Sequence, residues 1–371
     1  MKILILNAGS SSLKYKLFNK KIETLADGLM ERIGQNGETK NHSDALKKAL
    51  DHLKKTGVIT SLKEITAVGH RVVHGGDMFK NPVRINAKVE KQIKSLFKLA
   101  PLHNPHNLKV IESCSKTLKK IPQVAVFDTA FHESLPEKAF IYPLPYNLYK
   151  KDKIRKYGFH GTSHAYVSNQ TAKLLKKKKT RIVVCHLGNG SSVSAVLNGK
   201  SVDTSMGFTP LEGIPMGTRS GDIDPAIPLF LIKKLNRTPE QVDEILNKKS
   251  GLLGISNLSS DMRDLWANNK KPGPKLALEV LCYRLAKYIA SYTVPLQGLD
   301  AITFTGGIGE HAHYIRTKTC ENLKHLGIKL DQKLNKKDNI VISDKTSKVK
   351  IFVIPTDEEK QIAIETIKIV K

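Results

Sequence analysis

The stretch ILILNAGSSSLKYKLF, residues 3–18, begins with four aliphatic residues, turns through six small residues and returns as an alternating segment with lysines. An ordinary hairpin needs a turn of only two residues. This turn offers three consecutive hydroxyls, an amide and several backbone N–H groups, which in a tight turn form an anion-binding concavity. Ser10, Ser12, Lys14 and Lys16 share one parity and so one face of the returning strand. The stretch therefore predicts a phosphate cradle with cations beside it, rather than a plain turn.

The same unit occurs a second time in the chain. The stretch RIVVCHLGNGSSVSAVLNGK, residues 181–200, is again an aliphatic strand, a turn of small residues and a returning alternating strand. A third glycine turn, FTGGIGE at 304–310, follows another apolar strand. Two copies of a strand–turn–strand unit predict a duplicated fold with a ligand between its halves.

Strand-like and helix-like segments alternate along the 371 residues, which is typical of an α/β protein, and the length favours two domains. We expect strands at 2–6, 67–73, 123–127, 181–187, 192–197, 301–305 and 350–354. We expect helices at 43–55, 86–99, 163–178, 274–294, 312–326 and 357–370. Helix 274–294 is apolar on most faces, which predicts burial between layers or in a subunit interface.

The charge balance is strongly basic, with 61 Lys and Arg against 34 Asp and Glu, a net charge of +27. Such a surface attracts anions, and small anionic substrates fit it as well as nucleic acid. Aromatic residues make up only 6% of the chain and no nucleic-acid-binding motif is present, so we expect no nucleic-acid partner. A lysine-biased composition without a functional role is the alternative explanation.

The remaining composition excludes several classes of protein. Four cysteines lie far apart, so neither a metal-binding pair nor a disulfide framework is expected. No apolar run reaches the length of a membrane span and no signal peptide is apparent, which predicts a cytoplasmic protein without a membrane partner. The segment NGKS at 198–201 has Ser194 where a Walker loop needs glycine, and GGIG at 306–309 does not complete a dinucleotide fingerprint.

Ten stretches in order along the chain resemble the acetate kinase family, within the sugar kinase, heat-shock chaperone and actin superfamily. They are NAGSSSLKY (7–15), GHRVVHGG (69–76), APLHNP (100–105), VFDTAFH (126–132), YGFHGTSH (157–164), HLGNGSS (186–192), MGFTPLEGIPMGTRSGDIDP (206–225), SSDMR (259–263), FTGGIGE (304–310) and IPTDEE (354–359). The resemblance implies reversible Mg-dependent phosphoryl transfer between ATP and acetate, giving ADP and acetyl phosphate. It also implies a homodimer, and Mn²⁺ is an alternative metal.

The fold that this resemblance implies is a pair of duplicated ribonuclease-H-like domains, the actin-like ATPase fold, with an active-site cleft between them. We expect an N-terminal domain at 1–128, joined by the C-terminal helix 359–371. The second, nucleotide-binding domain is expected at 129–358.

The resemblance also assigns the nucleotide and metal sites. Asn7 and Glu358 are the expected metal residues, and Lys14 is expected on a nucleotide phosphate. The other expected nucleotide residues are His186, Leu187, Gly188, Asn189, Gly190, Asp261, Met262, Arg263, Gly307, Ile308, Gly309, Glu310 and His311. Most relatives have Asn at the position of His311, so adenine contacts are expected to differ there.

The catalytic assignments agree with the chemistry of the reaction. A carboxylic acid has a pKa of about 4, so acetate is ionised and needs no general base. Two anions must instead be brought in line, which requires positioning and positive charge. The resemblance gives these roles to Arg71, Arg219 and His160, for which an ordinary strand arginine, loop cation and core histidine are the alternatives. Asp128 follows a strand, and we expect it to hold metal-bound water or an active-site arginine.

Two further sets of residues have structural alternatives. Val73, Leu102, Phe159 and Pro210 match the apolar pocket for the acetate methyl group, although each is equally suited to ordinary core. Residues 356–359 also form a capping-box pattern, in which Glu359 is the box residue and Glu358 is free for the metal.

Other functions remain open at this stage. A propionate or butyrate kinase of the same superfamily differs by the size of an apolar pocket, which changes binding by only about 1–3 kcal/mol per methylene. A non-catalytic ATP-dependent binding module is a different class, but it would lack the two arginines and the histidine beside an apolar pocket.

Overall fold

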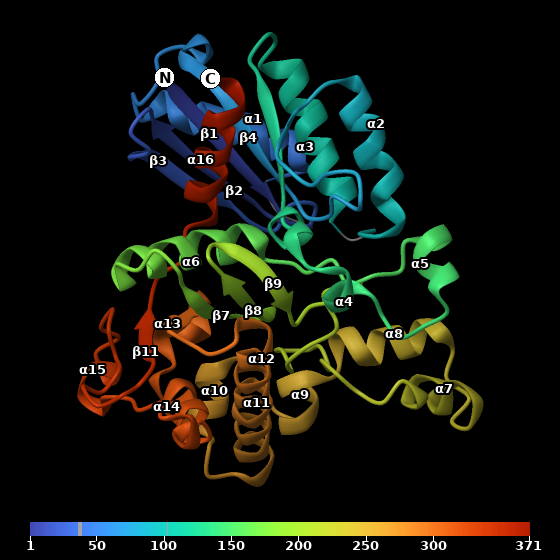
Figure 1. Ribbon diagram of the computed structural model, residues 1–371. Coiled ribbons are helices and arrows are strands. Elements are labelled where there is room, and N and C mark those ends of the chain that lie inside the picture. Colours follow the sequence, from blue (N-terminus) through green and yellow to red (C-terminus); the bar gives the residue numbers. More distant parts are fainter. Residues whose placement is uncertain (36–38, 102) are drawn as a thin grey trace. The chain divides into compact units, whose positions relative to one another are not determined.

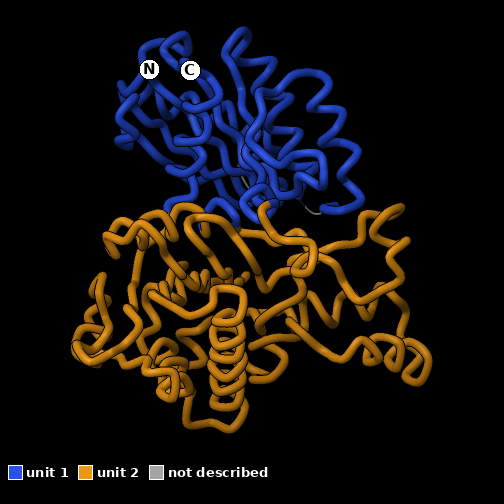
Figure 2. The backbone as a smooth tube through the Cα atoms, in the orientation of Figure 1, with its two compact units in different colours: residues 1–133, 161–163, 357–371 blue, residues 134–160, 164–356 orange. Residues whose placement is uncertain are grey.

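The computed structural model describes residues 1–35, 39–101 and 103–371. The chain forms two compact units (Figure 2). The first comprises 1–133, 161–163 and 357–371, and the second comprises 134–160 and 164–356. The sequence prediction had placed residues 129–133, 161–163 and 357–358 with the second domain. Each unit is an α/β structure built around one sheet (Figure 1).

The sheet of the first unit has the strand order β3-β2-β1-β4-β6-β5. Its strands are β1 (Lys2–Ala8), β2 (Leu13–Asn19), β3 (Thr24–Met30), β4 (Ile65–Val72), β5 (Val83–Arg84) and β6 (Gln123–Phe127). The pairs β1–β2 and β2–β3 are antiparallel, whereas β1–β4 and β4–β6 are parallel. Strand β2 directs Lys14 and Lys16 to one face while Leu13 and Tyr15 are buried, which confirms the expected parity of the lysines.

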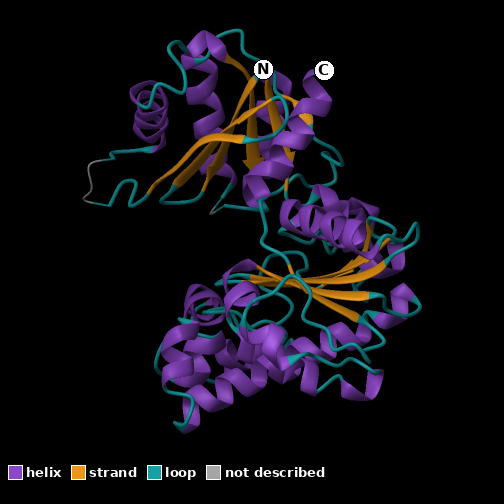
Figure 3. Cartoon of the chain, turned by 90° about the vertical axis from the view of Figure 1, so that its left-hand side faces the viewer, coloured by secondary structure: helices purple, strands orange, loops and turns teal. Residues whose placement is uncertain are grey.

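Helices cover both faces of this sheet (Figure 3). The main helices of the unit are α1 (His42–Lys55), α2 (Ala87–Ser95), α3 (Asn104–Thr117) and α16 (Glu358–Val370). Helix α16 packs Ile362 and Ile367 against one face, and α1 and α3 pack against the other. A Cβ atom on Gly69 would lie 2.3 Å from Thr366 Oγ1, so the close approach of β4 and α16 requires glycine there.

The sheet of the second unit has the order β11-β10-β7-β8-β9. Its strands are β7 (Arg181–Leu187), β8 (Ser191–Leu197), β9 (Lys200–Thr204), β10 (Ala301–Thr305) and β11 (Lys350–Val353). The pairs β7–β8 and β8–β9 are antiparallel, and β7–β10 and β10–β11 are parallel. This is the arrangement of β1, β2, β3, β4 and β6, so the structure confirms the duplication that the two glycine turns predicted.

The second unit is richer in helices than the first. They are α4 (Glu137–Phe140), α5 (Tyr146–Asp152), α6 (Gly161–Leu175), α7 (Ala226–Lys233), α8 (Pro239–Lys248), α9 (Gly251–Ser256), α10 (Met262–Ala267), α11 (Pro272–Ser291), α12 (Thr293–Leu296), α13 (Gly306–His311), α14 (His313–Glu321) and α15 (Gln332–Lys336), the first three residues of α6 being counted with the first unit. Helix α11 buries one face, including Leu281, Leu285 and Ile289, against the sheet core. On the other face of the sheet, Thr171 of α6 hydrogen-bonds Thr303 of β10.

Within the described ranges, no helix is both long enough and apolar enough to cross a lipid bilayer.

Two buried histidines at the end of β4 predict how the stability of the first unit depends on pH. Burial lowers the pKa of His70 to about 4 and that of His74 to about 4. Because the folded pKa lies below the unfolded value, neutral histidine stabilises the fold above pH ~6.5, and this contribution is lost as pH falls toward ~4. At about pH 5 this effect should lower the free energy of unfolding by roughly 2 kcal/mol for each histidine.

Urea unfolding at about pH 7.5 and about pH 5 measures this loss. His70→Asn retains a donor for Gln123, which accepts a hydrogen bond from His70 in the wild type. The variant should show a pH-dependent loss smaller than wild type by roughly 2 kcal/mol. The exposed His325→Asn is the matched control and should leave the loss unchanged. An equal loss in wild type and His70→Asn would show that His70 does not contribute.

Candidate functional site

The carboxyl ends of β4 and β6 bring an arginine and a buried carboxylate together in the first unit. Arg71 Nε lies 3.1 and 3.0 Å from the two carboxylate oxygens of Asp128, and Arg71 Nη2 lies 2.6 Å from Oδ2. Asp128 is 1% exposed. Burial alone would lower the pKa of Arg71, but the Asp128 and Glu358 charges and the hydrogen bonds to Asp128 raise it. The arginine is therefore held permanently charged in one orientation.

Asn7, at the start of the first glycine turn, connects this pair to the N-terminus of α16. Its Oδ1 accepts a hydrogen bond from Arg71 Nη1 at 3.1 Å, and its Nδ2 donates to Glu359 Oε1 at 3.0 Å. Glu359 is only 2% exposed and lies 2.9 Å from Lys14 Nζ and 3.6 Å from Lys16 Nζ. We call the eight residues Asn7, Lys14, Lys16, Arg71, Asp128, Asp357, Glu358 and Glu359 the ionic cluster.

The expected capping box at 356–359 is wrong. Asp357, not Thr356, caps α16, because its side chain accepts a hydrogen bond from the Lys360 N–H. The Glu359 carboxylate turns instead toward the lysines of β2. Burial would raise the pKa of Glu359, but its hydrogen bonds with Lys14 and Asn7 and the charges of Lys14 and Lys16 outweigh this and lower it.

The pKa of Glu358 is shifted upward, in the opposite direction to that of Glu359. It is 17% exposed, and its Oε2 lies 3.7 Å from Arg71 Nε. Burial raises its pKa, the Arg71 charge opposes the rise, and the charges of Asp128 and Glu359 add to it. The ionic cluster contains four carboxylates and three basic side chains, so its charges leave one carboxylate in excess.

This excess fits a divalent cation. Carboxylate and amide oxygens are suitable ligands for Mg²⁺, which is commonly bound through one or two carboxylates with waters and substrate phosphates. Glu358 supplies such a carboxylate, and Asn7 Oδ1 supplies an amide oxygen of the same cluster. Over the described part of the chain, no group of three or more His, Cys, Asp and Glu residues could hold a metal by itself. The ionic cluster thus suits a metal that brings most of its ligands with it.

In the second unit, two histidines and an arginine lie beside the glycine turn that follows β7. His160 has a left-handed backbone conformation, with φ 55°, at the start of α6. Its Nδ1 lies 2.9 Å from Ser192 Oγ, and its ring contacts that of His186 at a centroid distance of 4.3 Å. A Cβ atom on Gly190 would lie 3.5 Å from both His160 Nε2 and Arg219 Nη1, so the two side chains converge on this glycine.

Arg219 is a partly buried cation that contacts two neutral groups. Its Nη1 donates to the Pro210 carbonyl at 3.2 Å and contacts Met216 Sδ at 3.7 Å. No acidic side chain among the described residues forms an ion pair with it, and burial lowers its pKa. Gly217 of the same loop donates its N–H to the Asn189 carbonyl, which ties this loop to the glycine turn. The second unit therefore holds a desolvated positive charge beside backbone of the kind that binds phosphate.

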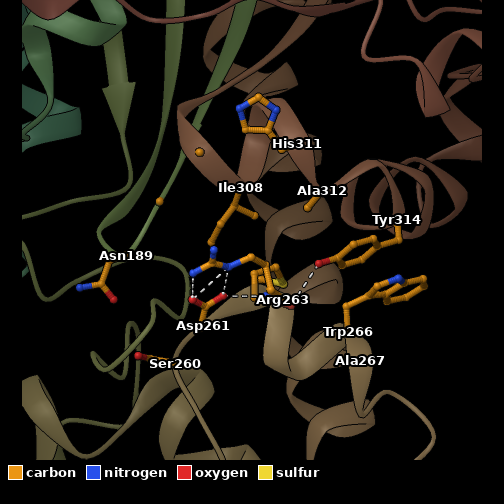
Figure 4. Close-up of a pocket in the computed structure, with 13 residues that line it drawn as sticks. Asn189, Ser260, Asp261, Arg263, Trp266, Ala267, Ile308, His311, Ala312 and Tyr314 are labelled. Atoms are coloured by element: carbon orange, nitrogen blue, oxygen red, sulfur yellow. Dashed lines mark hydrogen bonds and ion pairs between the residues drawn. The ribbon is translucent and has the colours of Figure 1, made fainter.

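A cavity of about 750 Å³ opens next to this turn, within the second unit (Figure 4). Its lining contains eight of the residues that the sequence assigned to nucleotide, namely Gly188, Asn189, Asp261, Met262, Arg263, Gly307, Ile308 and His311. Asp261 caps α10 and is paired with Arg263, with Nε 3.0 Å from Oδ1. The cavity also contains Ser260, Trp266, Ala267, Ala312 and Tyr314, which sequence analysis missed.

The other expected nucleotide residues lie outside the lining of this cavity. Leu187 is 1% exposed and belongs to the core, and Gly309 is buried within α13. Glu310 folds back on its own helix, where Oε1 accepts a hydrogen bond from the Gly306 N–H at 2.9 Å. Gly190 and His186 border the turn, and Lys14 is in the ionic cluster of the first unit.

The residues expected around the acetate methyl group belong to different units. Val73, in the first unit, is 6% exposed. Phe159, 3% exposed, and Pro210 are in the second unit. Leu102 lies outside the described residues. The methyl pocket stays a prediction.

Comparisons with known proteins cover the full length of the chain. The family model described as the acetokinase family matches residues 2–364. A protein named acetate kinase from Dictyoglomus turgidum is 52% identical over 396 aligned residues, which cover 100% of this chain and 98% of that relative. An acetate kinase from Clostridium beijerinckii is 50% identical over 400 aligned residues, with 100% of each chain covered.

Solved structures also match this chain over its full length. The crystal structure of Porphyromonas gingivalis acetate kinase has a TM-score of 0.94 at 43% identity, with 100% of both chains covered. A propionate kinase from Francisella tularensis has a TM-score of 0.93 at 44% identity, with 99% of both chains covered. The fold thus agrees with solved structures along the whole chain.

Proposed function

Because this chain belongs to the acetokinase family, we propose that it transfers the γ-phosphoryl group of ATP reversibly to acetate, giving acetyl phosphate and ADP. The observation that carries this proposal is Arg219, a desolvated guanidinium without an ion-pair partner among the described residues, beside the glycine turn that borders the 750 Å³ cavity. Burying a cation without a counter-charge is unfavourable, so the burial of Arg219 is explained if a bound substrate supplies the negative charge.

Arg219 is suited to the transferring phosphoryl group. The charge of that group is spread over three equatorial oxygens in the transition state, so catalysis depends on positioning and electrostatic stabilisation. A guanidinium presents its N–H donors in a rigid fork that matches phosphate geometry. His160 faces the same glycine as Arg219 and can donate a hydrogen bond to the same group.

Arg71 is suited to the acetate carboxylate. A guanidinium has five N–H donors. Asp128 and Asn7 engage Nε, Nη2 and Nη1, which leaves one N–H on each terminal nitrogen. Two such donors match the two oxygens of a carboxylate. Asp128 acts as a positioning residue that fixes this fork and keeps it charged.

We assign the metal to Asn7 and Glu358, as the sequence predicted, with Mg²⁺ as the preferred ion and Mn²⁺ as the alternative. When bound, the metal neutralises charge on the nucleotide phosphates. Removing the Glu358 charge should weaken this binding without unfolding the chain.

Glu358→Gln should lose activity that excess Mg²⁺ partly restores, and a Mg²⁺ concentration that stabilises wild type should raise the melting temperature of the variant much less. Mass action gives wild type about 2.7 kcal/mol at a hundredfold excess over Kd. Glu359→Gln is the neighbouring control: it breaks the pairs with Lys14 and Lys16 and should cost about 1–3 kcal/mol of stability. Thermal shift with and without Mg²⁺ measures both effects. If Mg²⁺ stabilises Glu358→Gln as much as wild type, the metal assignment is wrong.

The chain is proposed to act as a homodimer through α7. This helix has no buried residue, and Leu229 and Phe230 are 54% and 56% exposed. Contiguous apolar surface of this kind marks interaction sites. Phe230→Glu should therefore shift the molar mass measured by light scattering from dimer to monomer. Leu29→Glu, at a similarly exposed position in the first unit, should leave the dimer intact. A wild-type monomer would contradict the assembly.

The alternative substrates are propionate and butyrate. The similarity to a propionate kinase structure makes propionate the closer competitor. Hydroxylamine trapping of the acyl phosphate, with ATP, Mg²⁺ and acetate, propionate or butyrate, distinguishes the three. We expect the highest kcat/KM with acetate. Propionate or butyrate outperforming acetate would falsify the substrate assignment, and ATP turnover without any acyl phosphate would favour a binding module.

A further inference from the structure

Two aromatic side chains form one wall of the 750 Å³ cavity. Trp266 of α10 and Tyr314 of α14 are stacked, with ring centroids 3.7 Å apart and an interplanar angle of 6°. Both are only partly buried, so part of each ring faces the cavity. In Figure 4 the pair lies on the opposite side of the view from Asn189 of the glycine turn. The cavity therefore has backbone suited to phosphate at one end and aromatic surface at the other.

The pair is held in place from two directions. Tyr314 donates its hydroxyl to the Met262 carbonyl at 3.1 Å, which links α14 to α10. Burial raises the pKa of Tyr314 to about 12, so the hydroxyl remains a donor. The His313 ring meets both aromatic rings edge-on, at centroid distances of 6.4 and 5.6 Å. A surface fixed in this way can stack a planar ligand with little loss of side-chain entropy.

The rest of the lining combines small residues with the polar side chains of Ser260, Arg263 and His311. Ala267 and Ala312 are among the small residues, and a Cβ atom on Gly307 would meet no atom within 4 Å. The acidic group of this lining, Asp261, accepts hydrogen bonds from the backbone N–H, Nε and Nη2 of Arg263. Its hydrogen-bonding capacity is thus largely used within the protein rather than left for a ligand.

We propose that Trp266 and Tyr314 form the stacking platform for the nucleotide base and select purine over pyrimidine nucleotides by ring area. This inference rests on the proposed phosphoryl transfer from a nucleotide. Base–aromatic stacking is tolerant of base identity because every base has a π-face. The larger ring area of a purine should favour purines over pyrimidines, whereas ATP and GTP, both purines, should differ only weakly.

The size of the effect follows from stacking energies. Alanine substitution at such platforms changes binding by about fivefold to 150-fold, equivalent to ~1–3 kcal/mol. We expect kcat/KM for ATP to exceed that for CTP by roughly tenfold or more, and ATP and GTP to agree within about fivefold. Trp266→Ala and Tyr314→Ala should each lower the ATP/CTP ratio, because the value for ATP loses the larger stacked area and falls more than the value for CTP.

Trp266 is the only tryptophan of the chain, so intrinsic fluorescence reports on this wall alone. Titration of the intact protein with ADP or GDP should change the tryptophan emission saturably. Inorganic pyrophosphate, which lacks a base, should leave it unchanged. An equal change with pyrophosphate would overturn the proposal, because the signal would then come from the phosphates.

Conservative variants separate stacking from structure. Tyr314→Phe loses only the hydrogen bond to Met262 and should keep the purine preference, whereas Tyr314→Ala should weaken ADP binding by roughly tenfold. Tyr283→Ala, at an exposed position of α11, is the matched control and should change neither the ATP/CTP ratio nor the affinity for ADP. An ATP/CTP ratio that is the same in wild type and Trp266→Ala contradicts the platform.

The two proposals fail in different ways. If wild type forms acyl phosphate equally fast with ATP and CTP, the platform is wrong and the phosphoryl transfer stands. If it forms none with any nucleotide, the proposed function is wrong, and the fluorescence titration still decides the platform.

Discussion

Replacing Arg219 with alanine should lower kcat by at least about a hundredfold, while the melting temperature changes little. A lost charge-assisted contact of about 3 kcal/mol in the transition state corresponds to this factor. The structure also predicts that the substitution changes the stability of the fold little. Arg219 has no ion-pair partner among the described residues, and burial lowers its pKa, so the substitution removes a cation that the fold does not stabilise.

The lysine variant tests the geometric part of this argument. Arg219→Lys keeps the charge but presents a point charge in place of the fork, so it should recover little activity. Steady-state kinetics of the two variants, with melting curves as the folding control, give the answer. Near-wild-type turnover in Arg219→Lys would leave charge as the whole explanation. A large fall in melting temperature in Arg219→Ala would contradict the absence of a structural role.

Arg71→Ala should have the opposite signature, with lost stability and a raised KM for acetate as well as slower turnover. It leaves Asp128, which is 1% exposed, without the cation that contacts both of its oxygens. Breaking a buried ion pair from one side costs about 3–5 kcal/mol. In a unit of roughly 150 residues this corresponds to a fall in melting temperature of about 6–20 °C.

A double-mutant cycle separates the pair from the substrate effect. Asp128→Asn alone leaves Arg71 with a neutral partner, and Arg71→Ala with Asp128→Asn removes both charges. The double variant should be more stable than Arg71→Ala, because the uncompensated carboxylate is gone. Its KM for acetate should stay high, because the carboxylate fork is still absent. Additive stability losses, or an unchanged KM in Arg71→Ala, would contradict the assignment of Arg71.

The sequence predicted those parts of the site whose residues lie close together along the chain. The turn at Asn7–Ser12 and the turn at Gly188–Gly190 each carry strand, small residues and returning strand within one short segment. Their repetition predicted the two matching sheets. Glu359 was placed wrongly because acids in a first helical turn are ambiguous, and its position depends on Lys14 and Lys16, which are distant in sequence.

The aromatic wall of the cavity was missed for a related reason. Trp266 and Tyr314 belong to segments without a motif of their own, and their contact depends on how α10 packs against α14. Helix α3 was also missed, although Pro105 near its start is a common signal for a helix N-terminus. Its hydrophobic periodicity is modest, and buried polar residues such as Asn104 and Asn107 interrupt it.

The central claim is that an oxygen of acetate attacks the transferring phosphorus and becomes the bridging oxygen of acetyl phosphate, and isotope labelling tests it most closely. Acetate labelled with ¹⁸O at both oxygens is incubated with the enzyme, ATP and Mg²⁺, and the acetyl phosphate formed is examined by ³¹P NMR. Attack on phosphorus by acetate predicts one ¹⁸O bonded to phosphorus in every product molecule, with the second ¹⁸O retained in the carbonyl group. Acetyl phosphate whose phosphorus carries only unlabelled oxygen would contradict it, because the bridging oxygen would then have come from phosphate.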